Sequence, residues 1–206
     1  MGRKAHWERA YTDKEPSELG WHRSTLETSV AWIELLEAPL DAAIIDVGGG
    51  VSTLIDDLLV QGYRDLTLLD ISRTALESVR TRLEVKADEI SWVQGDIAEL
   101  TLPEHRYSVW HDRAVFHFLV DPGQRAQYLK TMTKSLKRDG YALIATFALE
   151  APSKCSGLPV QRYSGEDLAE ALGPGYTLEK QQKELHTTPG GVSQMYNYCL
   201  FRRIDT

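Results

Sequence analysis

Three glycines in a row stand between an apolar run and a helix-like run in the stretch AIIDVGGGVSTLIDDLL, residues 42–58. Glycines in such a turn let the backbone bend sharply and approach a ligand with no Cβ in the way. Asp70 follows the next apolar run, twenty residues after Gly50, a spacing suited to accepting hydrogen bonds from both hydroxyls of a ribose. Asp46 precedes the glycines and Asp96 follows the third apolar run. The alternative is that each strand-end aspartate only caps the next helix.

An alternation of strands and helices must position these residues. Apolar runs and helical periodicity predict strands at 42–47, 66–70, 89–94, 107–111 and 141–147, and helices at 52–60, 73–83 and 124–136. Strands that alternate with helices pair in parallel through right-handed crossovers, with helices on both faces of the sheet. Ligands bind beyond the carboxyl ends of such strands, where the strand order reverses. The loops after the first four strands should therefore be considered together.

The N-terminal segment differs from this alternating core. Residues 24–36 predict a helix, and the segment before them carries the aromatic residues Trp7, Tyr11 and Trp21. An amphipathic start with three large aromatics can act as a lid over the open side of a cofactor. The alternative is that Trp7 and Trp21 only cover a hydrophobic edge of the sheet.

The C-terminal part of the chain predicts an antiparallel hairpin. A short helix at 166–172 leads to two extended runs, 176–186 and 192–202, joined by strong turn residues. Such a pair closes an otherwise parallel sheet. We expect one domain over 1–206, with a lid and helix at 1–40, a cofactor-binding core at 41–150, and a substrate loop with the hairpin at 151–206.

Four motifs stand in order at the expected strand ends: Asp46-x-Gly48-x-Gly50, Leu69-Asp70, Gly95-Asp96-Ile97 and the segment after the fourth strand. This succession resembles the class I S-adenosylmethionine-dependent methyltransferases, and the hairpin resembles their sixth and seventh strands. The resemblance implies an α/β fold, a three-layer Rossmann-like sandwich with a seven-stranded, mostly parallel sheet and an antiparallel C-terminal hairpin. The aromatic segment resembles that of small bacterial methyltransferases and, more distantly, that of seven-strand protein-lysine methyltransferases.

The resemblance also implies S-adenosylmethionine as the cofactor and S-adenosylhomocysteine as its product. Gly48 and Gly50 are expected under the methionine part, Asp70 at the ribose, and Asp96 with Ile97 at the adenine. The further residues expected to bind the cofactor are Trp7, Tyr11, Trp21, Asp46, Gly49, Ile71 and His111.

NAD is the alternative cofactor, because its fingerprint is also a glycine turn followed by an acid about twenty residues later. That fingerprint has a third glycine three residues after the second, and Thr53 stands there in this chain. The Gly95-Asp96-Ile97 motif and the terminal hairpin have no role in the nicotinamide interpretation. The sequence therefore favours S-adenosylmethionine.

Methyl transfer from a sulfonium is a direct displacement, so we expect a lid and at most one base. His117, Asp112 and Arg113 are the expected catalytic residues, because the family places residues near the methyl group after the fourth strand. The ordinary pKa of histidine makes His117 a candidate base, the alternative being a histidine satisfied within its helix. Asp112 and Arg113 alternatively pair with each other or fix the loop. His111 and His117 are six residues apart, so no metal site is expected.

The loop ALEAPSKCSGLPVQRYS, residues 148–164, is expected to shape the substrate pocket. Cys155 within it is either a contact for a soft substrate or a small loop residue. With Cys199 it fits neither a disulfide framework nor a paired metal-ligand spacing, as expected for a reducing compartment.

Composition limits the remaining possibilities. The net charge of −7 argues against nucleic acid as the main partner, because such binding depends on Lys and Arg. No apolar run approaches ~18 residues and the start lacks the features of a signal peptide, so we expect a cytoplasmic protein with no membrane contact.

We therefore expect a methyltransferase that acts on a small-molecule nucleophile. A thiol or another soft acceptor is as suitable as an oxygen or nitrogen atom. One alternative is a protein-lysine methyltransferase, since an acidic rim suits a basic partner protein. Another is a module that binds the cofactor without catalysis.

Overall fold

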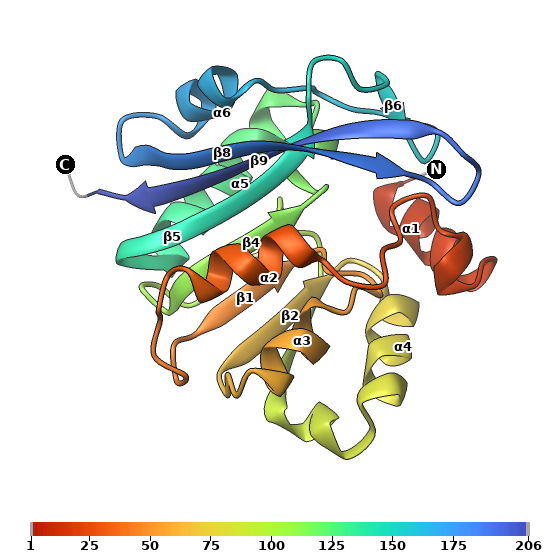
Figure 1. Ribbon diagram of the computed structural model, residues 1–206, viewed down its shortest axis with the longest axis horizontal. Helices are drawn as coiled ribbons and strands as arrows, with labels where there is room; N and C mark the ends of the chain where they lie inside the picture. Colours follow the sequence, from red (N-terminus) through yellow and green to blue (C-terminus); the bar gives the residue numbers. More distant parts are fainter. Residues whose placement is uncertain (1, 205–206) are drawn as a thin grey trace.

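A seven-stranded sheet forms the centre of the structure, a computed structural model that describes residues 2–204 (Figure 1). The strand order is β3-β2-β1-β4-β5-β9-β8; neighbours from β3 to β5 are parallel, and β9 is antiparallel to both β5 and β8. The strands are β1 (Ile44–Val47), β2 (Leu66–Asp70), β3 (Ile90–Gln94), β4 (Tyr107–Arg113), β5 (Leu136–Phe147), β8 (Tyr176–Thr187), β9 (Ser193–Arg203) and the separate pair β6 (Lys154–Cys155) and β7 (Leu158–Pro159). The expected fold class is confirmed.

Helices cover both faces of this sheet. They are α1 (Arg3–Thr12), α2 (Glu27–Glu34), α3 (Leu54–Val60), α4 (Arg73–Leu83), α5 (Pro122–Ser135) and α6 (Gly165–Leu172), with short 3-10 turns η1 (Pro16–Glu18), η2 (Glu84–Glu89) and η3 (Phe116–Phe118). Buried side chains of α2, α3 and α4 pack with Ile44 on one face, whereas those of α5 and α6 pack with Ile45 on the other. Adjacent residues of β1 thus serve opposite layers, as a pleated strand requires. Within residues 2–204 no helix combines the length and apolar character needed to cross a bilayer.

The strand order reverses at β1. The chain runs outward from β1 to β2 and β3, and then returns to place β4 on the other side of β1. Because these strands are parallel, the turns that follow them gather at one edge of the sheet. The helix α1 lies at this edge, next to the start of α4 (Figure 1).

Element boundaries differ from the sequence expectations at a few places. The helix α2 begins at Glu27 rather than at residue 24. The helix α5 begins earlier than expected, at Pro122, because the Asp121 side chain accepts a hydrogen bond from a backbone N–H of its first turn. It ends one residue early because Leu136 pairs with Tyr107 of β4 and so becomes the first residue of β5.

Candidate active site

A cavity lies at the edge where β1, β2, β3 and β4 end. It holds about 720 Å³ of empty space, a volume that includes space open to solvent at its mouth. The expected site residues that line it are Trp7, Tyr11, Trp21, Gly48, Asp70, Ile71, Asp96, Ile97 and Arg113. These residues, which the sequence analysis selected, thus meet at one cavity, although they come from four strand ends and from the N-terminal segment.

Asp70 is buried at the end of β2, with 3% of its surface exposed. One carboxylate oxygen accepts the Gly50 backbone N–H at 2.9 Å, and the other accepts the Ser72 backbone N–H at 2.8 Å. Burial raises the pKa of Asp70 to about 7, although these two hydrogen bonds act in the opposite direction. Each carboxylate oxygen has a second lone pair, so both retain the capacity to accept a ribose hydroxyl.

Side chains approach the glycine turn closely at Gly48 and Gly50. Gly48 and Gly50 have φ of +63° and +57°, a left-handed conformation that favours glycine. A Cβ added to Gly48 would lie 2.1 Å from a methyl carbon of Val115, and one added to Gly50 would lie 2.3 Å from the hydroxyl of Tyr11. Only glycine therefore leaves the backbone of this turn in place beside the cavity.

Asp96 joins the cavity to the N-terminal helix. Its Oδ1 accepts the Ala98 backbone N–H at 3.0 Å, while its Oδ2 pairs with Arg3 at 2.6 Å. Glu8, also on α1, accepts hydrogen bonds from the backbone N–H and hydroxyl of Thr74 at the start of α4. Arg3 was missed in the sequence, because a lone arginine 93 residues from its partner gives no local signal.

The three expected lid aromatics form one cluster across the cavity. The ring of Trp7 meets those of Trp21 and Phe118 edge-on, at centroid distances of 5.4 and 4.9 Å. Tyr11 meets Trp21 in the same way at 5.8 Å. None of the residues of α1 is fully buried, so this helix contributes its aromatic side chains to the cavity wall rather than to the core.

The position of His117 argues against its expected role as a base. The side chain is fully buried and lines no cavity found at this edge. Its Nδ1 accepts the Phe147 backbone N–H at 3.1 Å, so the neutral ring carries its proton on Nε2. Burial, assisted by the charge of Arg113, lowers the pKa of His117 to about 3. The alternative interpretation, a histidine held within the fold, matches the Nδ1 contact, although Nε2 is buried without a hydrogen-bond partner among the described residues.

Asp112 likewise stabilises the turn after β4 instead of facing the cavity. It is fully buried, and its carboxylate accepts the backbone N–H groups of Val115 and Phe116 and the hydroxyl of Tyr128, the last at 2.6 Å. Burial raises the pKa of Asp112 to about 6. Of the two alternatives for this residue, the loop-fixing role agrees with its contacts.

Arg113 is the member of the expected catalytic group that reaches the cavity. Its Nε donates to the hydroxyl of Tyr198 at 3.0 Å, its Nη1 donates to the Trp21 carbonyl at 3.1 Å, and its guanidinium lies 4.4 Å from the ring centre of Tyr196. Its Nη2 has no hydrogen-bond partner among the described residues. The wall of the cavity thus contains a cation whose hydrogen-bond partners are neutral, with the Glu184 carboxylate close enough to interact with it electrostatically.

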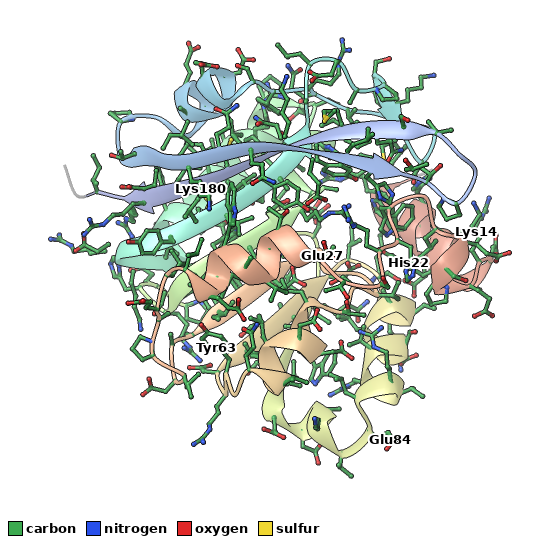
Figure 2. All side chains as sticks on the ribbon, in the orientation of Figure 1. Lys14, His22, Glu27, Tyr63, Glu84 and Lys180 are labelled. Atoms are coloured by element: carbon green, nitrogen blue, oxygen red, sulfur yellow. The ribbon has the colours of Figure 1, made fainter. Side chains whose placement is uncertain are left out.

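A second, smaller cavity of about 420 Å³ shares Trp21, Gly48 and Arg113 with the first. The expected cofactor residues Asp46, Gly49 and His111 line this one. His22, between α1 and α2, is also part of its wall and lies close to α1 in Figure 2. His111 stands behind Asp46, with its Nδ1 2.7 Å from Asp46 Oδ1 and its Nε2 2.9 Å from Ser29 Oγ. Ser29 was missed because nothing in its neighbourhood on α2 indicates such a contact.

Cys155, in the short pair of strands after β5, lines the first cavity. Burial raises the pKa of its thiol to about 11, so the thiol stays protonated at neutral pH. The expected irregular loop therefore places a small, unreactive side chain in the wall. Among residues 2–204, no group of three or more His, Cys, Asp or Glu side chains is arranged to hold a metal ion.

The residues present fit an adenosyl cofactor. Asp70 offers carboxylate oxygens with spare lone pairs, Ile71 and Ile97 offer apolar contact for a flat ring, and the glycine turn leaves backbone exposed. Asp46 supplies a further carboxylate at the second cavity, close to the turn.

Comparisons with known proteins agree with this geometry. Residues 44–140 match the family model described as a methyltransferase domain. The human EEF1A lysine methyltransferase 2 is 22% identical over 160 residues, which cover 71% of this chain and 68% of that relative.

Two solved structures share the fold. One, from work on the conversion of a disulfide bond into a thioacetal group during echinomycin biosynthesis, superposes with a TM-score of 0.79 at 17% identity, over 98% of this chain and 93% of that one. The other is the Burkholderia thailandensis 1,6-didemethyltoxoflavin-N1-methyltransferase with bound 1,6-didemethyltoxoflavin and S-adenosylhomocysteine. Its TM-score is 0.77 at 20% identity, over 98% of this chain and 87% of that one.

Proposed function

We propose that this protein, whose residues 44–140 match a methyltransferase domain, is an S-adenosylmethionine-dependent methyltransferase that transfers the methyl group to a small nucleophile. In this proposal the chain acts as one domain, because the lid and the terminal hairpin complete the site at the edge of a single sheet. The bound cofactor supplies an electrophilic methyl group on a sulfonium. The protein then has to align the nucleophile behind that group and exclude water.

In this proposal the cofactor would lie along the carboxyl ends of β1, β2 and β3. Asp70 would accept hydrogen bonds from the ribose hydroxyls, and Asp96 with Ile97 would hold the adenine. The backbone of Gly48 would run beneath the methionine part. What supports this placement is that all four residues contribute to the edge where the strand order reverses.

The aromatic cluster of Trp7, Tyr11 and Trp21 closes the site. A cation over an aromatic face gains ~0.5–2 kcal/mol depending on its burial, so these rings favour the positive sulfur of the cofactor. They also keep water from the reacting atoms. Neither role requires a base on the protein, in agreement with the buried, hydrogen-bonded state of His117.

The observation that carries the choice of acceptor is the guanidinium of Arg113 in the cavity wall. A cation without a hydrogen-bonded anion favours an acceptor that brings negative charge, and it disfavours a lysine ammonium group at the same place. A bound thiol in particular is stabilised as its thiolate, the form that attacks. The thiol proton would go to solvent before the site closes. The lone pair of the thiolate sulfur would then form the new bond to the methyl carbon as the bond from that carbon to the sulfonium sulfur breaks, which releases S-adenosylhomocysteine.

The test uses purified protein, S-adenosylmethionine and two aromatic thiols, 2-mercaptobenzoate and thiophenol. We expect methylation of 2-mercaptobenzoate above the enzyme-free background. In Arg113→Met its kcat/KM should fall by about 10-fold or more, since a hydrogen bond to a charged group contributes ~1.5–3 kcal/mol. The kcat/KM for thiophenol should fall less in this variant. Arg113→Lys, which keeps the charge, should recover part of the activity. A wild-type protein that methylates neither thiol contradicts a thiol acceptor.

Modification of a protein lysine is the second candidate, favoured by the human relative that is named as a lysine methyltransferase. A basic partner protein also suits a chain with a net charge of −7. The cationic side chain of Arg113 in the cavity wall argues against a lysine acceptor. With a labelled methyl group on the cofactor, the first candidate predicts label in small molecules and the second predicts label in a protein.

A further inference from the structure

Three side chains behind the glycine turn form a hydrogen-bonded series. His111 Nδ1 lies 2.7 Å from Asp46 Oδ1, and His111 Nε2 lies 2.9 Å from Ser29 Oγ. Asp46, Ser29 and His111 have 1%, 0% and 0% of their surface exposed. A carboxylate can only accept, so we assign the ring proton to Nδ1, and Nε2 accepts from the serine hydroxyl. The series joins α2 to β4 and β1.

The other carboxylate oxygen of Asp46, Oδ2, lies away from His111, against the glycine turn. Oδ2 has one recorded polar contact, the hydroxyl of Ser52 at 3.4 Å, which is long for a hydrogen bond between two oxygens. A Cβ added to Gly49 would lie 2.3 Å from Oδ2, so this oxygen sits against the glycine backbone. Asp46, Gly49 and Ser52 all line the second cavity. Oδ2 therefore keeps acceptor capacity on the side where the cavity lies.

The connectivity is that of a serine–histidine–aspartate triad, but the site does not suit nucleophilic catalysis. Ser29 is fully buried within α2 and lines neither cavity, so its hydroxyl has no route to a substrate. In a hydrolase the serine of such a triad faces the substrate and the aspartate lies farthest from it. Here the order is reversed, because Asp46 lines the second cavity and Ser29 lies farthest from it.

We propose that Ser29 and His111 are positioning residues that hold Asp46 so that its Oδ2 accepts a hydrogen bond from the ammonium group of S-adenosylmethionine. This rests on the placement of the amino-acid end of the cofactor at the glycine turn. A carboxylate held at Oδ1 has its plane fixed before the ligand arrives, so binding does not have to order it. His111, expected from the sequence to contact the cofactor, acts through Asp46 instead.

The test compares two ligands in equilibrium binding by calorimetry. S-adenosylhomocysteine has the amino-acid end, and 5′-methylthioadenosine keeps the adenosine and the sulfur but lacks that end. Two amide variants separate the nitrogens of His111: Asn can place its amide near the position of Nδ1, whereas Gln reaches toward that of Nε2. Ser135→Ala is the matched control for Ser29→Ala, because Ser135 is equally buried and its hydroxyl has no hydrogen-bond partner within residues 2–204.

We expect His111→Gln to raise the Kd of S-adenosylhomocysteine by about 10-fold or more, because a hydrogen bond to a charged group is lost. The Kd of 5′-methylthioadenosine should stay within about twofold of its wild-type value. His111→Asn should stay closer to the wild type. Ser29→Ala should weaken S-adenosylhomocysteine alone by about threefold, as for a neutral hydrogen bond. Ser135→Ala should change neither Kd.

The proposal is overturned if His111→Gln and His111→Asn weaken both ligands equally, or if the wild type does not prefer S-adenosylhomocysteine over 5′-methylthioadenosine. Ser29→Ala without any selective effect overturns the part assigned to Ser29. A wild-type protein that binds neither ligand overturns the cofactor assignment itself. No acceptor is present in this assay, so its outcome does not depend on which nucleophile receives the methyl group.

Discussion

The two ends of the cavity are built in different ways. At the strand ends, Asp70 and Asp96 accept backbone N–H groups from their own turns, two residues further along the chain. At the other end, Arg113 is held by Tyr198 and by the carbonyl of Trp21, 85 and 92 residues away. Local backbone hydrogen bonds therefore set most of the first region, although Arg3 joins Asp96 from 93 residues away, whereas the second depends on the packing of distant segments. In our account the first binds the cofactor and the second selects the acceptor.

The largest expected effect comes from breaking the first region at its backbone. Gly48→Ala adds a Cβ 2.1 Å from Val115 and places a side chain at a φ of +63°. The left-handed strain costs ~1–3 kcal/mol of stability. The turn must also shift, and a displacement near 1 Å costs about 100-fold in rate at a preorganised site, so we expect kcat/KM for methyl transfer to fall by that factor, together with weaker binding of S-adenosylhomocysteine.

Gly173→Ala is the control for this variant. Gly173 has a φ of +80°, and a Cβ added there meets no atom within 4 Å. It should lower Tm through the same backbone strain, measured by thermal unfolding, while binding stays at the wild-type level. Equal losses of binding in both variants would show that the effect of Gly48→Ala is general destabilisation.

Asp70→Asn is expected to have the next largest effect. It keeps the shape of the side chain but removes the charge, and each hydrogen bond to a charged acceptor contributes ~1.5–3 kcal/mol, so affinity for S-adenosylhomocysteine should fall about 10- to 100-fold. Calorimetry gives the Kd directly. Unchanged affinity would refute the ribose assignment.

The same residue predicts a pH dependence of cofactor binding. The pKa of Asp70 is raised to about 7, so lowering the pH through that value protonates the carboxylate and removes acceptor capacity. Affinity for the cofactor should therefore weaken from pH 8 to pH 6 in the wild type and stay level in Asp70→Asn. A wild-type profile that matches the variant would show that another group controls binding.

The smallest effect should follow from loosening the lid. Arg3→Ala removes the pair with Asp96, whose two side chains are 23% and 15% exposed. A partly exposed ion pair contributes ~0–1 kcal/mol, so release of S-adenosylhomocysteine in stopped-flow experiments should accelerate by at most about fivefold. Lys4→Ala is the neighbouring control, an exposed cation on the same helix. If Lys4→Ala accelerates release of S-adenosylhomocysteine equally, the pair of Arg3 with Asp96 has no specific role in holding the lid.

The same contrast explains what could be predicted from the sequence. Helix α4 and strand β2 were predicted with their observed bounds, because a regular apolar pattern and a following capping or turn residue specify both. The glycine turn and the aspartates at the strand ends were predicted because short spacing places them at one edge of a parallel sheet.

The long-range contacts of the two buried histidines could not be predicted in this way. The arrangement of His117 depends on the Phe147 backbone, and that of His111 depends on Ser29, 82 residues away. Residue type alone made His117 a candidate base, whereas its burial and its Nδ1 contact argue against that role. Only tertiary packing carries that information.

The central claim is that the methyl group goes to a small nucleophile. The most direct test incubates the protein with methyl-labelled S-adenosylmethionine and a cell extract in a sealed vial, and then counts label in macromolecules, in the low-mass fraction and in the headspace. The account predicts label in the low-mass fraction, or in the headspace if the product is a volatile methylated sulfur compound, with both signals reduced in Arg113→Met. Label that enters a protein band instead would contradict it and establish protein methylation.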